Sequence, residues 1–323
     1  MTKKIKWGII GPGKIANKFA ADLVISKDSV LYGVASRDLD KAKAFGEKYG
    51  ATNCYSSYEQ LAEDPEIDVI YIATPHVFHY ENTMMCLKKG KAVLCEKPMG
   101  INSDQVETML KEAAAQQVFL MEAMWTRFIP ATEKMLALLE QNAIGEVLFV
   151  HADFGFKGDG NLEGRLLNKK LGGGSLLDIG IYPIYLSLLV LGIPTDIKAM
   201  ARMTETEVDS YCSMLFNYSN DAKAILEATI EAKTPTEACI YGSEGTIKLH
   251  SRFHHANKIT LTKNGVEEIF DIDYKGNGYF HEIEEVNNCL HQGLTQSSKL
   301  PFKLSLDLIK LIDRVKNENG LEY

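Results

Sequence analysis

The chain has 323 residues, a length that suggests two domains. Of these residues 46% are hydrophobic and 24% are charged, which is typical of a soluble globular protein. Its net charge of −8 and the lack of a basic tail argue against a nucleic-acid partner. The longest apolar region, residues 176–191, contains Asp178 and Pro183 and is too short to span a bilayer, so we expect no membrane association.

Six cysteines are spread along the chain without a Cys-x-x-Cys pair or a framework spacing. In a chain of this size that distribution predicts reduced thiols, and we expect a cytoplasmic protein. The N-terminal apolar run is short and is interrupted by glycines, so we expect no targeting segment.

Near the N-terminus, an apolar segment at residues 7–10 predicts a buried parallel strand. Gly11, Gly13 and Ala16 follow it at the spacing of the Gly-x-Gly-x-x-Gly/Ala dinucleotide fingerprint. Gly11 permits the tight turn, Gly13 lets a pyrophosphate approach the main chain, and Ala16 lets the next helix, which begins near Lys14, pack closely. The N-terminus of that helix is therefore predicted to bind dinucleotide phosphates, through Gly11, Gly13, Lys14 and Ile15.

The second predicted strand, residues 31–35, ends at Ser36-Arg37-Asp38. NAD-binding folds place an acidic residue near this strand end to hold the ribose 2′-hydroxyl, whereas NADP binders favour a small polar residue and a cation. Ser36 occupies the acidic position and Arg37 follows it, so we predict a preference for NADP(H), with NAD(H) as the alternative. Asp38 would suit NAD, but it also fits the N-cap of a helix over residues 39–49.

The next buried strand, residues 69–73, ends at Thr74-Pro75, with His76 and His79 close behind. The spacing of the two histidines suits a metal, but no nearby carboxylate or cysteine completes a site, so we expect no metal there. Thr74, Pro75 and His79 are instead predicted to lie beside the cofactor, and a helix cap is the alternative for the histidines.

Glu96-Lys97-Pro98 follows a predicted strand at residues 92–95. Ligands bind an open parallel sheet at the carboxyl ends of its strands. We therefore predict that Glu96 contacts the cofactor and that Lys97 contacts cofactor and substrate; the alternative is a solvated loop lysine.

Two domains of different architecture are expected. A helix (103–116) and a strand (118–123) complete a doubly wound parallel sheet, which gives a dinucleotide-binding domain over residues 1–124. Residues 125–323 contain many segments with apolar and polar residues in alternation, as in an antiparallel sheet with one covered face. The expected strands are 146–156, 197–203, 211–218, 222–230, 238–241, 246–250, 259–262 and 267–272, and the expected helices are 131–141, 280–292 and 304–316.

Four segments in chain order resemble one known family: GIIGPGKIA, CEKPMG, MEAMWTRFIP and GGGSLLDIGIYP. They are similar to the Gfo/Idh/MocA oxidoreductases, and most similar to the branch of dimeric dihydrodiol dehydrogenases and NADP-dependent D-xylose dehydrogenases. The resemblance covers nearly all of the chain. It implies an N-terminal Rossmann domain, a C-terminal α+β domain with an open, mostly antiparallel sheet, and a homodimer or higher homo-oligomer formed through that sheet.

The resemblance also implies catalytic residues. The lysine of the family's Glu-Lys-Pro motif matches Lys97. Many members carry a histidine at the end of the Asp-x-Gly-x-His motif, where this chain has Tyr182, and in the dihydrodiol dehydrogenase branch a tyrosine is the proposed acid/base. Lys97 and Tyr182 are therefore predicted to handle the hydroxyl proton. Asp178 lies four residues before Tyr182, on the same face if the segment is helical, where it would orient the substrate or Lys97.

Other side chains near these motifs are candidate binding residues. Trp125 and Arg127 are assigned to the domain junction near nicotinamide and substrate; the alternative is core packing and an ion pair. Phe154 and Phe156 are candidates for the substrate pocket, although ordinary core packing also fits their alternation. The histidine pair at 254–255 is expected in a surface turn.

These observations favour an enzyme that transfers a hydride between NADP(H) and a carbinol or carbonyl carbon of a small sugar, polyol or vicinal diol. Tyrosine and lysine have an ordinary pKa of about 10, and nearby positive charges favour the phenolate that such a reaction needs. Two alternatives stay open: a reductase of a dicarbonyl or keto-sugar, and a non-catalytic NADP-binding regulatory protein of the same fold. The intact Lys97, Asp178 and Tyr182 argue against the second.

Overall fold

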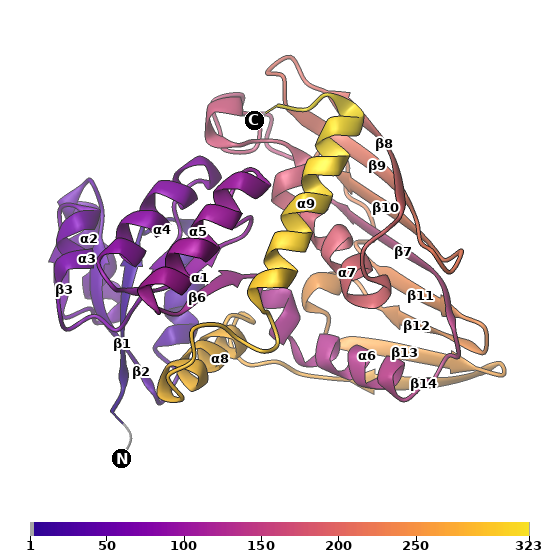
Figure 1. Cartoon of the computed structure of the whole chain (residues 1–323), viewed down its shortest axis with the longest axis horizontal. Coiled ribbons are helices and arrows are strands. Elements are labelled where there is room, and N and C mark those ends of the chain that lie inside the picture. Colours follow the sequence, from indigo (N-terminus) through magenta and orange to yellow (C-terminus); the bar gives the residue numbers. More distant parts are fainter. Residues whose placement is uncertain (1–2, 323) are drawn as a thin grey trace. The chain divides into compact units, whose positions relative to one another are not determined.

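The computed structural model describes residues 3–322. The chain divides into two compact units, the first formed by Met1–Phe128 and Tyr274–Leu306 and the second by Ile129–Asp273 and Asp307–Tyr323. Within the described residues, the long sheets are one of six strands and one of eight, which confirms the predicted α/β fold class (Figure 1).

The sheet of the first unit is parallel, in the order β3-β2-β1-β4-β5-β6. Its order reverses between β1 and β4, which is where ligands bind in doubly wound sheets. The edge strand β3 has only three residues and was not predicted, because so short a segment has no readable alternation. The strands are β1 Ile5–Ile10, β2 Ser29–Ala35, β3 Asn53–Tyr55, β4 Val69–Ile72, β5 Ala92–Glu96 and β6 Leu120–Ala123.

Helices cover both faces of this sheet (Figure 1). α3, α4 and α5 pack against one another in series, whereas α1 packs against α2 and α8. Right-handed crossovers between parallel strands place these two groups on opposite faces. The helices of this unit are α1 Lys14–Leu23, α2 Leu39–Tyr49, α3 Tyr58–Glu63, α4 His79–Lys88, α5 Ser103–Gln116 and α8 Phe280–His291.

The helix α8 belongs to the first unit although it lies far along the chain. The buried carboxylate of Asp22, at the end of α1, accepts hydrogen bonds from the main-chain N–H of Asn277 (2.7 Å) and of Phe280 (3.0 Å). Trp7 donates from its ring nitrogen to Asn287 at 3.1 Å. The predicted second domain, residues 125–323, differs from the observed division here, because these contacts are invisible to local sequence patterns.

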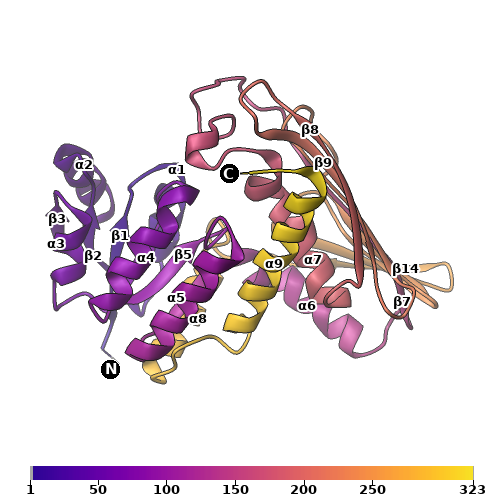
Figure 2. The same cartoon turned by 45° about the horizontal axis from the view of Figure 1, so that its top comes forward.

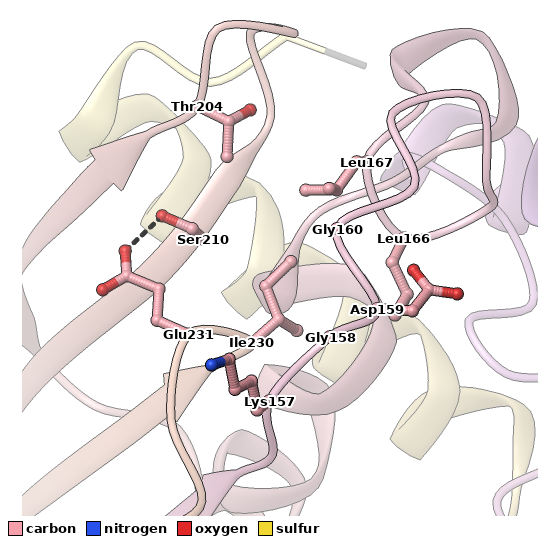
Figure 3. Close-up of a pocket in the computed structure, with 10 residues that line it drawn as sticks. All are labelled: Lys157, Gly158, Asp159, Gly160, Leu166, Leu167, Thr204, Ser210, Ile230 and Glu231. Atoms are coloured by element: carbon pink, nitrogen blue, oxygen red, sulfur yellow. Dashed lines mark hydrogen bonds between the residues drawn. The ribbon is translucent and has the colours of Figure 1, made fainter.

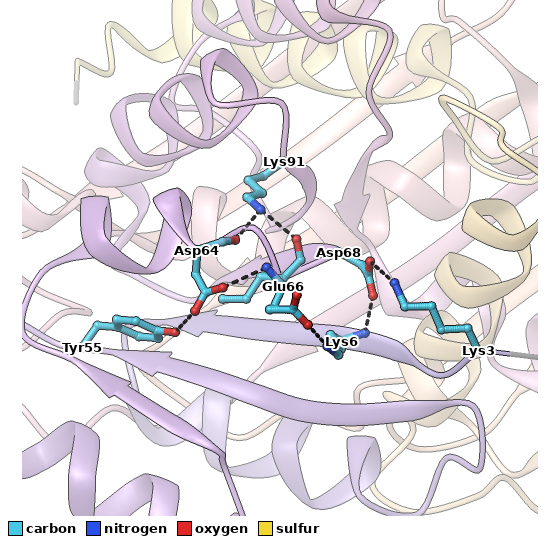
Figure 4. A network of polar contacts seen from close by, with 8 residues as sticks. Lys3, Lys6, Tyr55, Asp64, Glu66, Asp68 and Lys91 are labelled. Carbon is cyan, nitrogen blue, oxygen red and sulfur yellow. Dashed lines mark hydrogen bonds and ion pairs between the residues drawn. The ribbon is translucent and has the colours of Figure 1, made fainter.

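A polar network occupies the edge of the sheet where β4 and β5 begin, opposite the edge expected to bind ligands (Figure 4). Lys91 donates from Nζ to the main-chain oxygens of Asp64 (2.5 Å) and Ile67 (2.9 Å). The Tyr55 hydroxyl donates to the Asp64 carboxylate. These contacts hold the turn between α3 and β4, and they serve the fold rather than the site.

The sheet of the second unit is mixed, in the order β14-β13-β12-β11-β7-β10-β9-β8. β10 pairs in parallel with β7, and the other neighbouring strands pair antiparallel. The strands are β7 Val147–Gly155, β8 Asp196–Met203, β9 Asp209–Asn217, β10 Lys223–Thr229, β11 Ala238–Gly242, β12 Gly245–Leu249, β13 Lys258–Lys263 and β14 Val266–Asp271, and the helices are α6 Pro130–Glu140, α7 Ile181–Leu191 and α9 Phe302–Asn319, which begins in the first unit.

The two faces of this sheet differ (Figure 2). On one face α7 packs against β7 and β10, and alternate residues such as Val150 and Ala224 are fully buried. On the other face Met200, Leu215 and Ile225 are exposed, so the sheet is open there.

The apolar region before β8 forms the core of the second unit. The helical run Lys169–Leu191 is longer than the apolar region 176–191 and is apolar enough to span a membrane, but 83% of its most apolar part is buried inside the protein. A core helix has these properties. Leu176–Gly180 form a π-helical turn directly before α7.

Candidate active site

The predicted phosphate-binding turn has the required geometry. Gly11 has φ of +83°, and a Cβ on it would lie 3.0 Å from the Ala73 carbonyl oxygen, so only glycine fits. A Cβ on Gly13 would meet only one atom within 4 Å, at 3.9 Å, which leaves space for a phosphate beside the main chain. Gly13 is the N-cap of α1 and provides no side-chain cap, so the first N–H groups of the helix at Lys14 and Ile15 suit an anion.

The end of β2 confirms the predicted role of Asp38 as a helix cap. Its carboxylate accepts hydrogen bonds from the N–H groups of Asp40 (3.1 Å) and Lys41 (3.3 Å), and these bonds lower the pKa of Asp38. Ser36 is buried, and its hydroxyl accepts from the Asp38 N–H, whereas Arg37 is exposed. The Asp38 carboxylate therefore caps α2, and Arg37 is an exposed cation next to Ser36.

His79 connects two loops of the cofactor edge. It is fully buried, with Nδ1 2.7 Å from the Pro98 oxygen and Nε2 2.8 Å from the Thr74 oxygen. Burial lowers its pKa, and a neutral ring donates to one of these carbonyls at a time. Both nitrogens therefore contact the main chain and hold the Thr74-Pro75 and Lys97-Pro98 segments together, and the contact of His79 with the cofactor stays a prediction.

Glu96 and Lys97 lie at the carboxyl end of β5, as predicted. Lys97 is half-buried, and its peptide bond to Pro98 is cis. Glu96 is buried and accepts a hydrogen bond from the Tyr71 hydroxyl, so at least one of its oxygens faces the interior of the unit.

Two buried carboxyl groups of the first unit were not singled out from the sequence. Glu122, on β6, is buried, and burial raises its pKa to about 7. Glu282, on α8, is fully buried, and burial followed by the charge of Glu96 raises its pKa well above the ordinary range. Glu122 stands inside the MEAMWTRFIP segment, and that is the signal that could have singled it out.

Trp125 and Arg127 follow β6 in the 3-10 turn Trp125–Phe128. The Trp125 ring is buried and stacks on Tyr279, with ring centres 4.5 Å apart. Arg127 donates from Nε to the Lys299 carbonyl at 3.0 Å. Both contacts lie within the first unit and fix these two side chains, whose roles toward cofactor and substrate stay predictions.

In the second unit, Tyr182 lies in the first turn of α7 and is buried within an aromatic group. Its ring centre is 5.6 Å from Phe154 and 4.9 Å from His254, and His254 stacks on Phe154 at 4.4 Å. The expectation of a surface turn at 254–255 is therefore wrong for His254, because the 3-10 turn Phe253–His255 buries its ring against these aromatics.

Asp178 binds an arginine that the sequence did not point to. Its two oxygens accept from the guanidinium of Arg165, at 2.7 and 3.1 Å, in a bidentate pair. The predicted α-helical spacing of Asp178 and Tyr182 is also corrected, because Asp178 lies in the π-helical turn and Tyr182 in α7. The arginine comes from the loop after β7, which has no regular pattern.

A pocket of about 310 Å³ opens beside that loop (Figure 3). The Ser210 hydroxyl donates to Glu231 at 2.6 Å across one wall. The other wall is apolar and joins the cluster of Ile179, Ala228 and Ile230, against which Phe154 and Phe156 also pack. Its polar lining includes Lys157, Ser210 and Glu231, and its apolar lining consists of Leu166, Leu167 and Ile230.

Among residues 3–322, no group of three His, Cys, Asp or Glu side chains is placed to hold a metal ion. The glycine turn and the N-terminus of α1, by contrast, fit a dinucleotide, since Gly11 allows the tight turn, Gly13 leaves space beside the main chain and no side chain caps the helix.

Comparison with known proteins agrees with this geometry. Residues 5–124 match the oxidoreductase family with an NAD-binding Rossmann fold, and residues 132–248 match the GFO/IDH/MocA C-terminal domain. A trans-1,2-dihydrobenzene-1,2-diol dehydrogenase of Xenopus tropicalis is 38% identical, over 98% of this chain and 99% of its own length. The human enzyme of that name is 33% identical, over 99% and 98%.

Solved structures show the same fold. A 3-ketoreductase of Actinomadura kijaniata, KijD10, in complex with NADP and TDP-benzene is 25% identical with a TM-score of 0.88, over 98% of both chains. An aldose-aldose oxidoreductase of Caulobacter crescentus, at 22% identity, has a TM-score of 0.90 over 98% of both chains. The comparisons thus favour an enzyme over the non-catalytic alternative: the chain belongs to the Gfo/Idh/MocA family and is an NAD(P)-dependent dehydrogenase acting on CH–OH groups.

Proposed function

We propose that the protein transfers a hydride between NADP(H) and a carbinol or carbonyl carbon of a sugar, polyol or vicinal diol. The relatives named for dihydrodiols and for 3-keto groups support this substrate class. Reduction of a keto-sugar is the same step in reverse.

The observation that supports NADP over NAD most strongly is the engagement of Asp38 in capping α2. Oδ1 of Asp38 accepts both capping bonds and Oδ2 faces the Lys41 ammonium at 3.5 Å, whereas the exposed Arg37 suits a 2′-phosphate.

Fluorescence titration with NADPH and with NADH tests this preference. Arg37→Ala should weaken NADPH binding by about tenfold or more and leave NADH binding nearly unchanged, since hydrogen bonds to charged groups contribute about 1.5–3 kcal/mol. Arg37→Lys is the matched control, because it keeps the charge and loses the planar fork. Tighter binding of NADH by the unmodified protein would contradict the assignment.

NADP, when bound, supplies the hydride acceptor at C4 of its nicotinamide ring. In our proposal Tyr182, as the phenolate, accepts the hydroxyl proton while the hydride leaves the carbinol carbon, so that the C–O bond becomes a carbonyl. The Lys97 ammonium stabilises the phenolate and binds the substrate oxygen. Asp178 orients the substrate side through its pair with Arg165.

Tyr182→Phe and Lys97→Met should each lower kcat by about 10²–10⁴-fold, the range expected for loss of a proton-transfer group. Thermal melting and NADPH titration of both variants serve as controls for folding and cofactor binding. Wild-type turnover by both variants would show that these residues are not the catalytic pair.

We further propose a homodimer formed through the open face of the eight-stranded sheet, and a cytoplasmic location. The exposed Met200, Leu215 and Ile225 support the first. The six cysteines, all of which lie in the described part of the chain as free thiols, support the second.

A further inference from the structure

The buried carboxyl group of Glu122 lies on β6, next to β5, which ends at Glu96 just before Lys97. In the parallel pair β5–β6, Glu122 stands opposite Cys95. Lys97 comes two residues after Cys95, directly beyond the end of β5. Its positive charge acts on the Glu122 carboxyl.

Hydrogen bonds connect Glu122 to the segment that contains Lys97. Oε1 of Glu122 accepts from the main-chain N–H of Met99 at 2.9 Å. Ser305, in the first turns of α9, lies close enough for its hydroxyl to lower the pKa of Glu122. Glu122 is only 3% exposed, so this carboxyl group fixes the Lys97–Met99 turn from inside the unit.

The groups around Glu122 make it sensitive to pH near neutrality. Burial raises the pKa of Glu122 to about 7, and the charge of Glu96 also raises it. Met99, Ser305 and the charge of Lys97 lower it. Cys95 is the remaining titratable neighbour on β5, and burial raises the pKa of its thiol too, so it stays neutral. Ionisation of Glu122 therefore places a negative charge near Lys97 as the pH rises through 7.

We propose that Glu122 is a positioning residue for Lys97: its carboxylate holds the Lys97 turn in place and stabilises the ammonium form of that side chain for the hydride-transfer step. The inference rests on the proposed role of Lys97. It gives the glutamate of the MEAMWTRFIP segment a function that the motif alone does not suggest.

The test compares kcat/KM of wild type and Glu122→Gln between pH 6 and 8.5. Glutamine keeps an oxygen for the Met99 N–H and removes only the charge. At pH 6 the wild-type group is neutral, so the two proteins should have similar activity; at pH 8.5 the variant should be about tenfold slower, equivalent to one pKa unit of lost charge interaction. A ratio that is constant over this range would overturn the proposal, because a purely structural role does not change with pH.

Two further variants keep the test decisive. Glu282→Gln is the matched control, a buried glutamate whose main charged neighbours are Glu96 and Asp22, and its activity ratio should be close to one at every pH. Ser305→Ala removes a hydrogen bond that lowers the pKa of Glu122 and changes no charge, so the pH step should move upward even if Glu122→Gln folds poorly. An unmoved step would overturn the proposal. Wild-type turnover by Lys97→Met would instead contradict the proposed function itself.

Discussion

Glu282 is a fully buried ionisable residue whose loss of hydration is not replaced by hydrogen bonds within the described residues. Both of its carboxyl oxygens are buried and have no hydrogen-bond partner among the residues that the structure describes. Burial raises its pKa well above the usual range, so the native state keeps a proton that the unfolded chain releases at a pH of about 4.3. The wild-type free energy of unfolding should therefore fall as pH rises from about 4.3 towards the native pKa.

Replacing Glu282 by Gln removes this titration. We therefore expect the free energy of unfolding of the variant minus that of wild type to increase steadily between pH 5 and pH 8, as measured by urea denaturation. Parallel stability curves for the two proteins would mean that Glu282 is hydrated or paired in solution.

Residue roles set by local sequence could be predicted, and roles set by distant contacts could not. Gly11, Gly13 and the Asp38 cap act within a few residues of themselves, and the structure places them as expected. His254 stacks on Phe154, and Arg165 pairs with Asp178, only because the folded chain brings these distant segments together. Neither lies in a motif, and no periodicity indicates the partner.

At the scale of elements, α8 shows how one side chain positions a helix from a distant part of the chain. Asp22 accepts hydrogen bonds from the segment that leads into α8 and from the Phe280 N–H, so it acts as a cap supplied by α1. Asp22→Ala should lower the free energy of unfolding by about 2 kcal/mol, the upper end of measured cap losses. Asp28→Ala, at an exposed aspartate beyond α1, is the control for charge removal in urea denaturation, and equal effects of the two changes would contradict this role.

Most elements could be predicted because their apolar spacing is strong, as in α2 and α5, whose bounds match the prediction. The three-residue strand β3 was missed for lack of pattern. The assignment of α8 to a unit depends on Asp22 and Asn287, which contact residues more than 250 positions away.

At the scale of the whole molecule, the open sheet face predicts the oligomeric state. Ile225 is 45% exposed in the middle of β10, and a charge there would be buried in the proposed dimer. Ile225→Glu should give a monomer in size-exclusion chromatography with light scattering. Ile25→Glu, at an equally exposed isoleucine of the first unit, should leave the dimer intact, and a monomeric wild type would contradict the interface.

The first unit is built from two separate segments of the chain, and this has a consequence for its synthesis on the ribosome. The segment Met1–Phe128 emerges first, but its partner segment Tyr274–Leu306 follows after the whole of Ile129–Asp273 has been translated. Until then Trp7 lacks its acceptor on Asn287, and Asp22 lacks the N–H groups that it binds. We therefore expect the nascent cofactor-binding unit to remain incompletely folded, and to need chaperones, until the second unit has been synthesised.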